Sequence, residues 1–275
     1  MDPHLPPPAP SSRPTGGLLY AGVSYSLPSG FRPLLLDLHL PEPRTGPVPL
    51  VVWLHGGGFH SGDRRYLPDT MPPDSVFEAV VAAGMAVASV DYRLSGEARF
   101  PSQLDDVKAA LAYLRAYAEP LGLDAGRIGV WGESAGALLA ALAALTTGGI
   151  SAAALWYSPS LLDTMQPDNP DASISRLVGG LPAQRPELIA QASPATHVSA
   201  AAPPFLLLHG TDDEQLPPVH SERLHAALLA AGASSTYLPI PDAGHCFSGH
   251  PDVPGLIAAT VGFLAEQLRP GRGPS

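Results

Sequence analysis

A serine lies between two glycines in the segment GVWGESAGALLAAL, residues 129–142. A free serine hydroxyl is a weak nucleophile at neutral pH and needs a neighbouring base. In a G-x-S-x-G turn between a strand and a helix, the flanking glycines relieve crowding and the hydroxyl projects from the turn. An apolar run precedes Ser134 and an Ala/Leu-rich helical pattern follows it. We therefore interpret Ser134 as a nucleophile, with an unreactive tight turn as the alternative.

A run of three glycines, in LHGGGF at residues 54–59, ends a Val-rich apolar segment. Acyl transfer builds negative charge on a carbonyl oxygen, and preorganised backbone N–H groups stabilise that charge. We expect Gly57 and Gly58 to donate from this loop, and Ala135 to donate from the position after the serine. A plain glycine turn is the alternative. A phosphate-binding loop is disfavoured because neither G-x-x-x-x-G-K-[ST] nor G-x-G-x-x-G is present.

One of the ten histidines, His245 in PDAGHCFSG, follows the last predicted strand in a loop that contains glycines. An imidazole can take the proton of Ser134 and return it to the leaving group. Most histidines in a protein have no such role, but the position of His245 after a strand favours a catalytic base.

An acidic loop follows the apolar run in LLLHGTDDEQLP and carries Asp212, Asp213 and Glu214. A carboxylate in this loop would orient the imidazole and stabilise its charged form. At least two of the three must instead belong to a solvated turn. Asp163, which follows the preceding strand, is a weaker candidate for the acid.

Apolar runs that alternate with helical patterns predict the elements that position these groups. We expect strands at 34–40, 48–56, 85–93, 127–132, 150–158, 203–210 and 234–240, and helices at 75–84, 102–122, after Ser134, at 221–232 and at 254–268. This alternation is typical of the α/β class, a mostly parallel twisted sheet with helices on both faces. Such sheets bind ligands at the carboxyl ends of their strands, where the candidate reactive groups lie.

We predict one domain over residues 18–268, with a small cap-like insertion at 158–202 over the pocket. Residues 1–17 are rich in Pro, Ser and Gly and are expected to form a disordered tail, as are residues 269–275. Neither a signal peptide nor an apolar run long enough to span a bilayer is recognisable.

The formal net charge of −10 makes nucleic acid a poor partner. The single cysteine, Cys246, excludes an internal disulfide framework and a multi-cysteine metal site, and it fits a reducing compartment. We therefore expect a cytoplasmic monomer or homodimer that acts on a small molecule and requires neither a metal nor an organic cofactor.

The chain resembles the α/β-hydrolase superfamily over roughly residues 32–268. It is most similar to the HGGG-type esterases and lipases: the hormone-sensitive-lipase-like group and the feruloyl- and xylan-esterase-like bacterial carboxylesterases. The resemblance rests on seven motifs: HGGGF (55–59), DYRL (91–94), FPSQLDDVKAALAYLR (100–115), RIGVWGESAG (127–136), SPATHV (193–198), PPFLLLHGTDDEQLP (203–217) and AGHCF (243–247). The segment SGEARFP after DYRL favours the feruloyl- and xylan-esterase side.

This resemblance implies an α/β-hydrolase fold and the cleavage of short-chain or aryl, feruloyl-type carboxylic esters. It implies Ser134 as the nucleophile, Asp213 as the acid and His245 as the base, in the chain order Ser, Asp, His that α/β-hydrolases use. It also implies that the backbone amides of Gly57, Gly58 and Ala135 form the oxyanion hole.

Three further expectations concern residues around these groups. Phe59, Leu162 and Met165 are candidates for lining the acyl pocket. Glu133, beside the nucleophile, is expected to be a structural hydrogen-bonding group rather than an acid or base. The segment Asp91 to Arg93 is expected to form ion pairs or to anchor a loop.

Three other functions remain open. An amide hydrolase of the arylformamidase or peptidase type would use the same machinery. A catalytically silent binding protein would have the same fold, although such proteins typically lose the nucleophile or the base. An interfacial lipase is disfavoured because no long apolar lid is recognisable.

Overall fold

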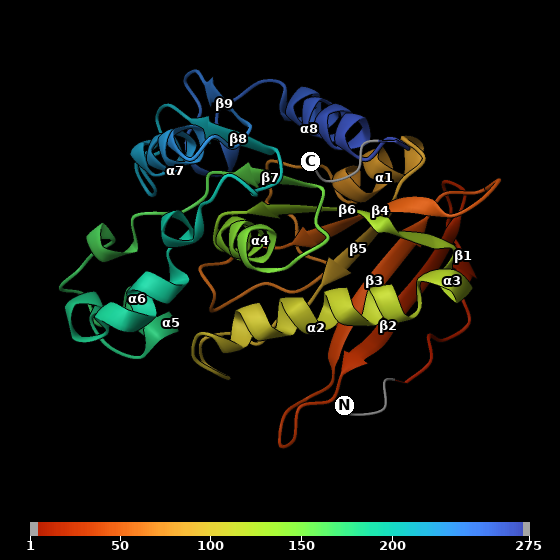
Figure 1. The fold of residues 1–275 in the computed structure, drawn as a ribbon, viewed down its shortest axis with the longest axis horizontal. Coiled ribbons are helices and arrows are strands. Elements are labelled where there is room, and N and C mark those ends of the chain that lie inside the picture. The colour runs from red at the N-terminus through yellow and green to blue at the C-terminus, as the bar shows by residue number, and fades with distance from the viewer. Residues whose placement is uncertain (1–4, 272–275) are drawn as a thin grey trace.

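The computed structural model describes residues 5–271, and a nine-stranded sheet runs through them (Figure 1). The strands lie in the order β1-β2-β3-β5-β4-β6-β7-β8-β9. Their bounds are β1 Ser11–Ser12, β2 Leu18–Ser26, β3 Leu34–Leu40, β4 Val48–Leu54, β5 Ala86–Val90, β6 Leu123–Glu133, β7 Ala152–Trp156, β8 Phe205–Gly210 and β9 Ser235–Ile240. From β5 to β9 every neighbouring pair is parallel, whereas β1, β2 and β3 join antiparallel at one edge.

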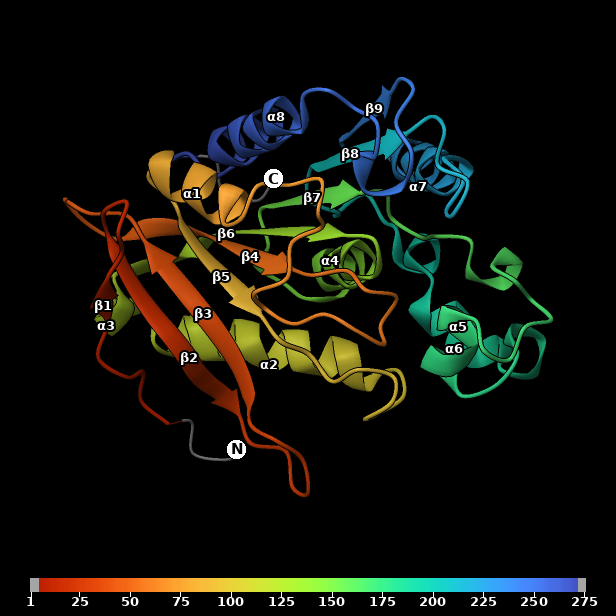
Figure 2. The ribbon, with the colours of Figure 1, turned by 180° about the vertical axis from the view of Figure 1, so that it is seen from behind.

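Helices cover both faces of the sheet, as the alternating pattern predicts. The helices of the main body are α1 Ser75–Ala82, α2 Ser102–Ala116, α3 Ala118–Leu121, α4 Ala135–Thr146, α7 Val219–Ala230 and α8 Val253–Gln267. Helices α1 and α8 pack on one face and α2, α4 and α7 on the other (Figures 1 and 2).

Strand β4 shows why the central strands read as continuous apolar runs. Leu50 and Val52 belong to the core under α2 and α4, while Val51 and Trp53 belong to the core under α1 and α8. A strand that is buried on both faces needs apolar side chains at every position.

The segment between β7 and β8 folds as a separate layer of short helices. These are the 3-10 turns η1 Leu162–Thr164, η2 Pro182–Gln184 and η3 Pro194–His197, and the helices α5 Ser173–Val178 and α6 Pro186–Ala192. Figure 2 shows α5 and α6 beyond the carboxyl ends of the central strands. This layer lies between Trp156 and Phe205, beyond that end of the sheet.

The N-terminal segment differs from the disordered tail predicted for residues 1–17. Ser11 and Ser12 pair antiparallel with β2, and Arg13 is buried in an ion pair with Glu78 of α1. These contacts come from β2 and α1, so the local Pro-rich composition does not reveal them. The tail residues 1–4 and 272–275 lie outside the described part of the chain. Within residues 5–271, no helix is both long and apolar enough to cross a bilayer.

Candidate active site

Ser134 occupies the turn between β6 and α4 with a positive φ of 50° and a ψ of −118°, a conformation that L-residues rarely adopt. The flanking glycines are required by close approach of the chain. A Cβ at Gly136 would collide with the carbonyl oxygens of Leu54 and His55, and one at Gly132 would collide with the backbone of Gly136. The turn therefore holds the serine at the carboxyl end of the sheet, as the G-x-S-x-G pattern predicts.

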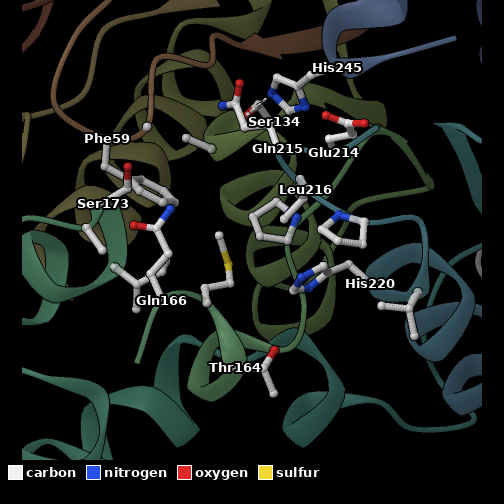
Figure 3. A pocket seen from close by; sticks show the side chains of 18 residues that line it. Phe59, Ser134, Thr164, Gln166, Ser173, Glu214, Gln215, Leu216, His220 and His245 are labelled. Carbon is white, nitrogen blue, oxygen red and sulfur yellow. Dashed lines mark hydrogen bonds between the residues drawn. The ribbon is translucent and has the colours of Figure 1, made fainter. Parts of the chain in front are cut away.

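Three polar side chains from distant segments form a hydrogen-bonded line. The distance from Ser134 Oγ to His245 Nε2 is 3.2 Å, and that from His245 Nδ1 to Asp213 Oδ2 is 2.7 Å. Because a carboxylate only accepts, Nδ1 carries the ring proton and Nε2 is free to accept from the serine hydroxyl. Figure 3 shows the hydroxyl and the imidazole side by side at one end of a pocket.

The carboxylate of Asp213 is buried and accepts several hydrogen bonds. The Leu216 amide donates to Oδ1 at 2.8 Å, and His209 Nε2 lies 3.4 Å from Oδ2. Burial by itself raises the pKa of Asp213, but the hydrogen bonds of His209 and His245 outweigh it and hold the pKa well below its usual range. The residue is therefore charged at neutral pH and can stabilise an imidazolium.

Within residues 5–271, the other three candidate acids form no hydrogen bond or ion pair with His245. Asp212 is exposed and accepts a hydrogen bond from the hydroxyl of Thr211. Asp163 and Glu214 are exposed as well, and Glu214 lies on the pocket wall. Of the carboxylates considered from the sequence, only Asp213 reaches the imidazole.

The glycine loop takes a backbone that favours glycine. Gly57, Gly58 and Phe59 all have positive φ, at 95°, 60° and 64°, and a Cβ at Gly57 would collide with the carbonyl of Ser61. Gly58 lines the pocket, and so does Ala135, whose amide lies in the first turn of α4 and has no partner within that helix. Gly57 adjoins the pocket wall without lining it.

Glu133 links this loop to the nucleophile turn. Its buried carboxylate accepts a hydrogen bond from the Gly56 amide. Burial raises the pKa of Glu133 to about 7, against the opposing effects of the Gly56 hydrogen bond and of nearby His245. The contact fits the structural role expected for this residue.

Residues 91–93 contact the segments on both sides of the glycine loop and helix α2. The carboxylate of Asp91 accepts from the Arg64 amide at 2.8 Å and from its guanidinium at 3.2 Å. Tyr92 donates to the His55 carbonyl at 2.8 Å, and Arg93 pairs with Asp106 at 2.6 Å. The predicted anchoring role of residues 91–93 agrees with these contacts.

A pocket of about 380 Å³ opens beside Ser134 and His245 (Figure 3). Phe59 and Met165 line it, in agreement with the sequence expectation, but Leu162 does not. Leu162 is fully buried in the core under the insertion, because η1 turns its side chain inward. Polar groups also line the pocket: Thr164, Gln166, Ser173, Glu214, Gln215 and His220.

Apart from Glu214, which the sequence offers as a candidate acid, the sequence singles out none of these polar groups. Most of them lie in the insertion or in the acidic loop, where no motif distinguishes a pocket residue from a surface residue. His220 follows a proline pair next to a helical pattern, and the backbone groups that it contacts lie 59 and 60 residues earlier in the chain. No local signal could have identified it.

Comparison with known proteins connects this geometry to a family. The sequence model of the BD-FAE family matches residues 36–228. The chain is 31% identical to esterase LipC of Mycobacterium tuberculosis over 74% of its length and 54% of the length of LipC. It is also 31% identical to esterase LipQ of the same organism, over 88% of the chain and 59% of LipQ. The chain thus spans little more than half the length of these curated relatives.

The folds of solved esterases agree with that match. A truncated carbohydrate esterase from gut microbiota superposes with a TM-score of 0.81 at 26% identity, covering 94% of this chain and 99% of that one. The predicted α/β-hydrolase fold class and the resemblance to bacterial esterases of this superfamily are therefore confirmed.

Proposed function

Because the chain belongs to the BD-FAE family of α/β-hydrolase esterases, we propose that it is a serine hydrolase that cleaves carboxylic esters. The observation that carries the proposal is the line from Ser134 through His245 to Asp213, with separations of 3.2 and 2.7 Å. A nucleophile, a base and an orienting acid in this order are what acyl transfer to a serine requires.

In the first half-reaction, Ser134 Oγ attacks the ester carbonyl carbon while His245 Nε2 takes the hydroxyl proton. Asp213, charged and buried, stabilises the imidazolium through Nδ1. The imidazolium then gives the proton to the departing alkoxide, and the alcohol leaves an acyl group on Ser134.

The negative charge on the carbonyl oxygen is received by backbone amides. We assign Gly57, Gly58 and Ala135 to this role. Each preorganised donor of this kind contributes about 3–4 kcal/mol to transition-state stabilisation. The support is the left-handed course of the glycine loop and the position of Gly58 and Ala135 on the pocket wall beside Ser134.

In the second half-reaction, water replaces the alcohol. His245 removes a proton from the water, the resulting hydroxide attacks the acyl carbon, and Ser134 leaves with the proton returned by the imidazolium. The net result is one carboxylic acid and one alcohol for each ester and water consumed.

We propose short-chain or aryl esters as substrates, with the acyl or alkoxy group in the pocket beside Phe59 and Met165. A volume of about 380 Å³ fits a small ester, and the similarity to a carbohydrate esterase supports ester chemistry on oxygen-rich molecules. We also propose a cytoplasmic monomer or homodimer. The single cysteine supports the compartment, which fractionation of cells would test, and sedimentation would test the assembly.

The test compares p-nitrophenyl acetate with N-formylkynurenine, an arylformamidase substrate, on the wild-type protein and on Ser134→Ala. Ester hydrolysis that is at least about 10³-fold slower in the variant supports the proposal, since the members of such a triad act as a unit. If the wild-type protein cleaved N-formylkynurenine faster than p-nitrophenyl acetate, the proposed function would change from esterase to amide hydrolase. Absence of turnover of both in the wild-type protein would favour a silent binding protein.

A further inference from the structure

His220 is a histidine of the pocket wall that takes no part in the reaction as proposed. It lies in the first turn of α7, and only 4% of its surface is exposed. Figure 3 shows its ring on the side of the pocket across from Phe59 and Ser173. A buried histidine that faces a ligand pocket raises the question of which ring atom a ligand would meet.

One edge of the ring is committed to the backbone. The Leu161 amide donates to Nδ1 at 3.0 Å and the Ser160 amide donates to the same atom at 3.2 Å, while the Ser160 hydroxyl donates to the His220 carbonyl. Because two N–H groups point at Nδ1, that nitrogen carries no proton, and the neutral ring must hold its proton on Nε2.

The opposite edge is left for a ligand. Within residues 5–271, His220 Nε2 has no protein hydrogen-bond partner, and the ring forms part of the pocket wall. Burial, reinforced by neighbouring His209, lowers the pKa of His220 to about 4, with Asp213 and Asp163 opposing the shift. His220 therefore presents a neutral Nε2–H donor to the pocket. The direction of this donor and the tautomer of the ring are both fixed by the backbone contacts at Nδ1.

We propose that His220 is a specificity-determining residue that donates from Nε2 to an uncharged oxygen of the substrate, so that the enzyme prefers esters with an ether or hydroxyl oxygen. This inference rests on the proposed esterase function and adds a substrate class to it. The ligand meets the donor inside the pocket, away from the ester group itself.

The surroundings of the donor favour a neutral oxygen over a carboxylate. The Glu214 carboxylate lies on the same pocket wall and would repel an anion. Thr164, Gln166 and Ser173 make the wall partly polar, whereas Phe59 supplies an apolar face. This mixture suits a chain or ring that carries oxygen better than it suits a pure hydrocarbon.

The test uses pairs of esters that differ only in one oxygen. On the acyl side, p-nitrophenyl 3-methoxypropanoate is compared with p-nitrophenyl pentanoate; on the alkoxy side, 2-methoxyethyl butanoate is compared with butyl butanoate. For each enzyme the ratio of kcat/KM within a pair cancels any common loss of activity. We expect the wild-type protein to favour the oxygenated member of one pair by about 3- to 10-fold, the effect of one neutral hydrogen bond.

Two substitutions at His220 separate the role of Nε2, which donates to the ligand, from that of Nδ1, which accepts from the backbone. In His220→Asn, the amide oxygen can accept from the Ser160 and Leu161 amides in place of Nδ1, but no donor reaches the position of Nε2. The ratio should fall to about 1. In His220→Gln, the longer side chain brings an N–H back toward that position, and part of the preference should return.

The matched control is His225→Asn on the same helix, since His225 contacts Ser235 and does not line the pocket. Its ratio should equal that of the wild-type protein. A wild-type ratio near 1 in both pairs, or an unchanged ratio in a folded His220→Asn, would overturn the inference.

A mutation-free readout covers the case in which the Asn variant does not fold. Moving the ether oxygen along the acyl and alkoxy chains should produce a preference at one position only, since the donor is fixed in space. A preference that is equal at all positions would overturn the inference. Failure of the proposed function looks different: Ser134→Ala would then hydrolyse all of these esters at the wild-type rate.

Discussion

The carboxylate of Glu133 accepts a hydrogen bond from the amide of Gly56, and this contact joins the glycine loop to the turn that holds Ser134. The two segments are 77 residues apart in the chain. In the proposed mechanism, one segment supplies two oxyanion donors and the other supplies the nucleophile. Glu133 is thus a positioning residue that fixes one half of the site relative to the other.

Removing this acceptor should impair catalysis more than it impairs folding. Glu133→Leu leaves the buried Gly56 amide unpaired, which costs about 1–3 kcal/mol and loosens the loop. We expect kcat for p-nitrophenyl acetate to fall about tenfold or more at a temperature well below the unfolding transition. Glu133→Gln retains an acceptor and should recover most of the activity. Equal activity of the Leu variant and the wild-type protein would show that the contact does not position the loop.

The same residue should make stability depend on pH in a defined direction. Its pKa is raised from 4.5 to about 7 in the folded protein, so the unfolded chain binds fewer protons between these values. The stability of the wild-type protein should therefore decrease, relative to Glu133→Gln, as the pH rises through this range, by at most about 3 kcal/mol. Urea unfolding of both proteins at pH 5 and pH 8 measures the difference. If the unfolding free energies of the wild-type protein and Glu133→Gln differed by the same amount at pH 5 and pH 8, the raised pKa of Glu133 would be contradicted.

Neighbouring aspartates should respond very differently to the same substitution. Asp213→Asn presents an amide to His245 Nδ1 and favours the wrong tautomer, so kcat should fall by about 10³- to 10⁴-fold. Asp212→Asn changes an exposed side chain that, among residues 5–271, accepts only from Thr211, and its kcat should stay within about twofold of the wild-type value. Steady-state kinetics with one ester measures both. If the Asp212 variant were the severe one, the acid would have to be reassigned.

A side chain added at Gly136, behind the turn that holds Ser134, should destabilise the protein. In Gly136→Ala the new methyl would meet the carbonyl oxygens of Leu54 and His55, and overpacking of this kind costs about 1–3 kcal/mol. Gly148→Ala is the matched control, because no atom of the described residues lies within 4 Å of its added Cβ. The urea midpoint of Gly136→Ala should lie well below that of the wild-type protein, whereas the midpoint of Gly148→Ala should stay close to it. Similar midpoints would mean that the backbone at Gly136 can move aside.

Much of the central sheet is predictable from the sequence because its strands are buried on both faces. The expected strand at 34–40 coincides with the antiparallel strand β3, and the predicted strands of the parallel part lie within a few residues of those observed. The edge is different. Strand β2, LLYAGVSYS, mixes polar and apolar residues and has irregular register with β3, so no clear period marked it. Its partner β1 is only two residues long.

The candidate site divides in the same way. Ser134 and the glycine loop have backbone requirements that the sequence displays directly, whereas the choice of Asp213 over Asp212 and Glu214 depends on which side of a loop faces inward. Pocket residues depend even more on tertiary packing. Leu162 was expected in the pocket but turns into the core, and His220 faces the pocket because backbone amides from a distant loop hold its ring.

The central claim is that Ser134 is a nucleophile activated by His245, and reaction with a fluorophosphonate probe followed by mass spectrometry tests it most directly. We predict one adduct on the peptide that contains Ser134 in the wild-type protein, none at that peptide in Ser134→Ala, and labelling at least about 10³-fold slower in His245→Ala. An unreactive wild-type protein, or His245→Ala labelled at the wild-type rate, would contradict the account.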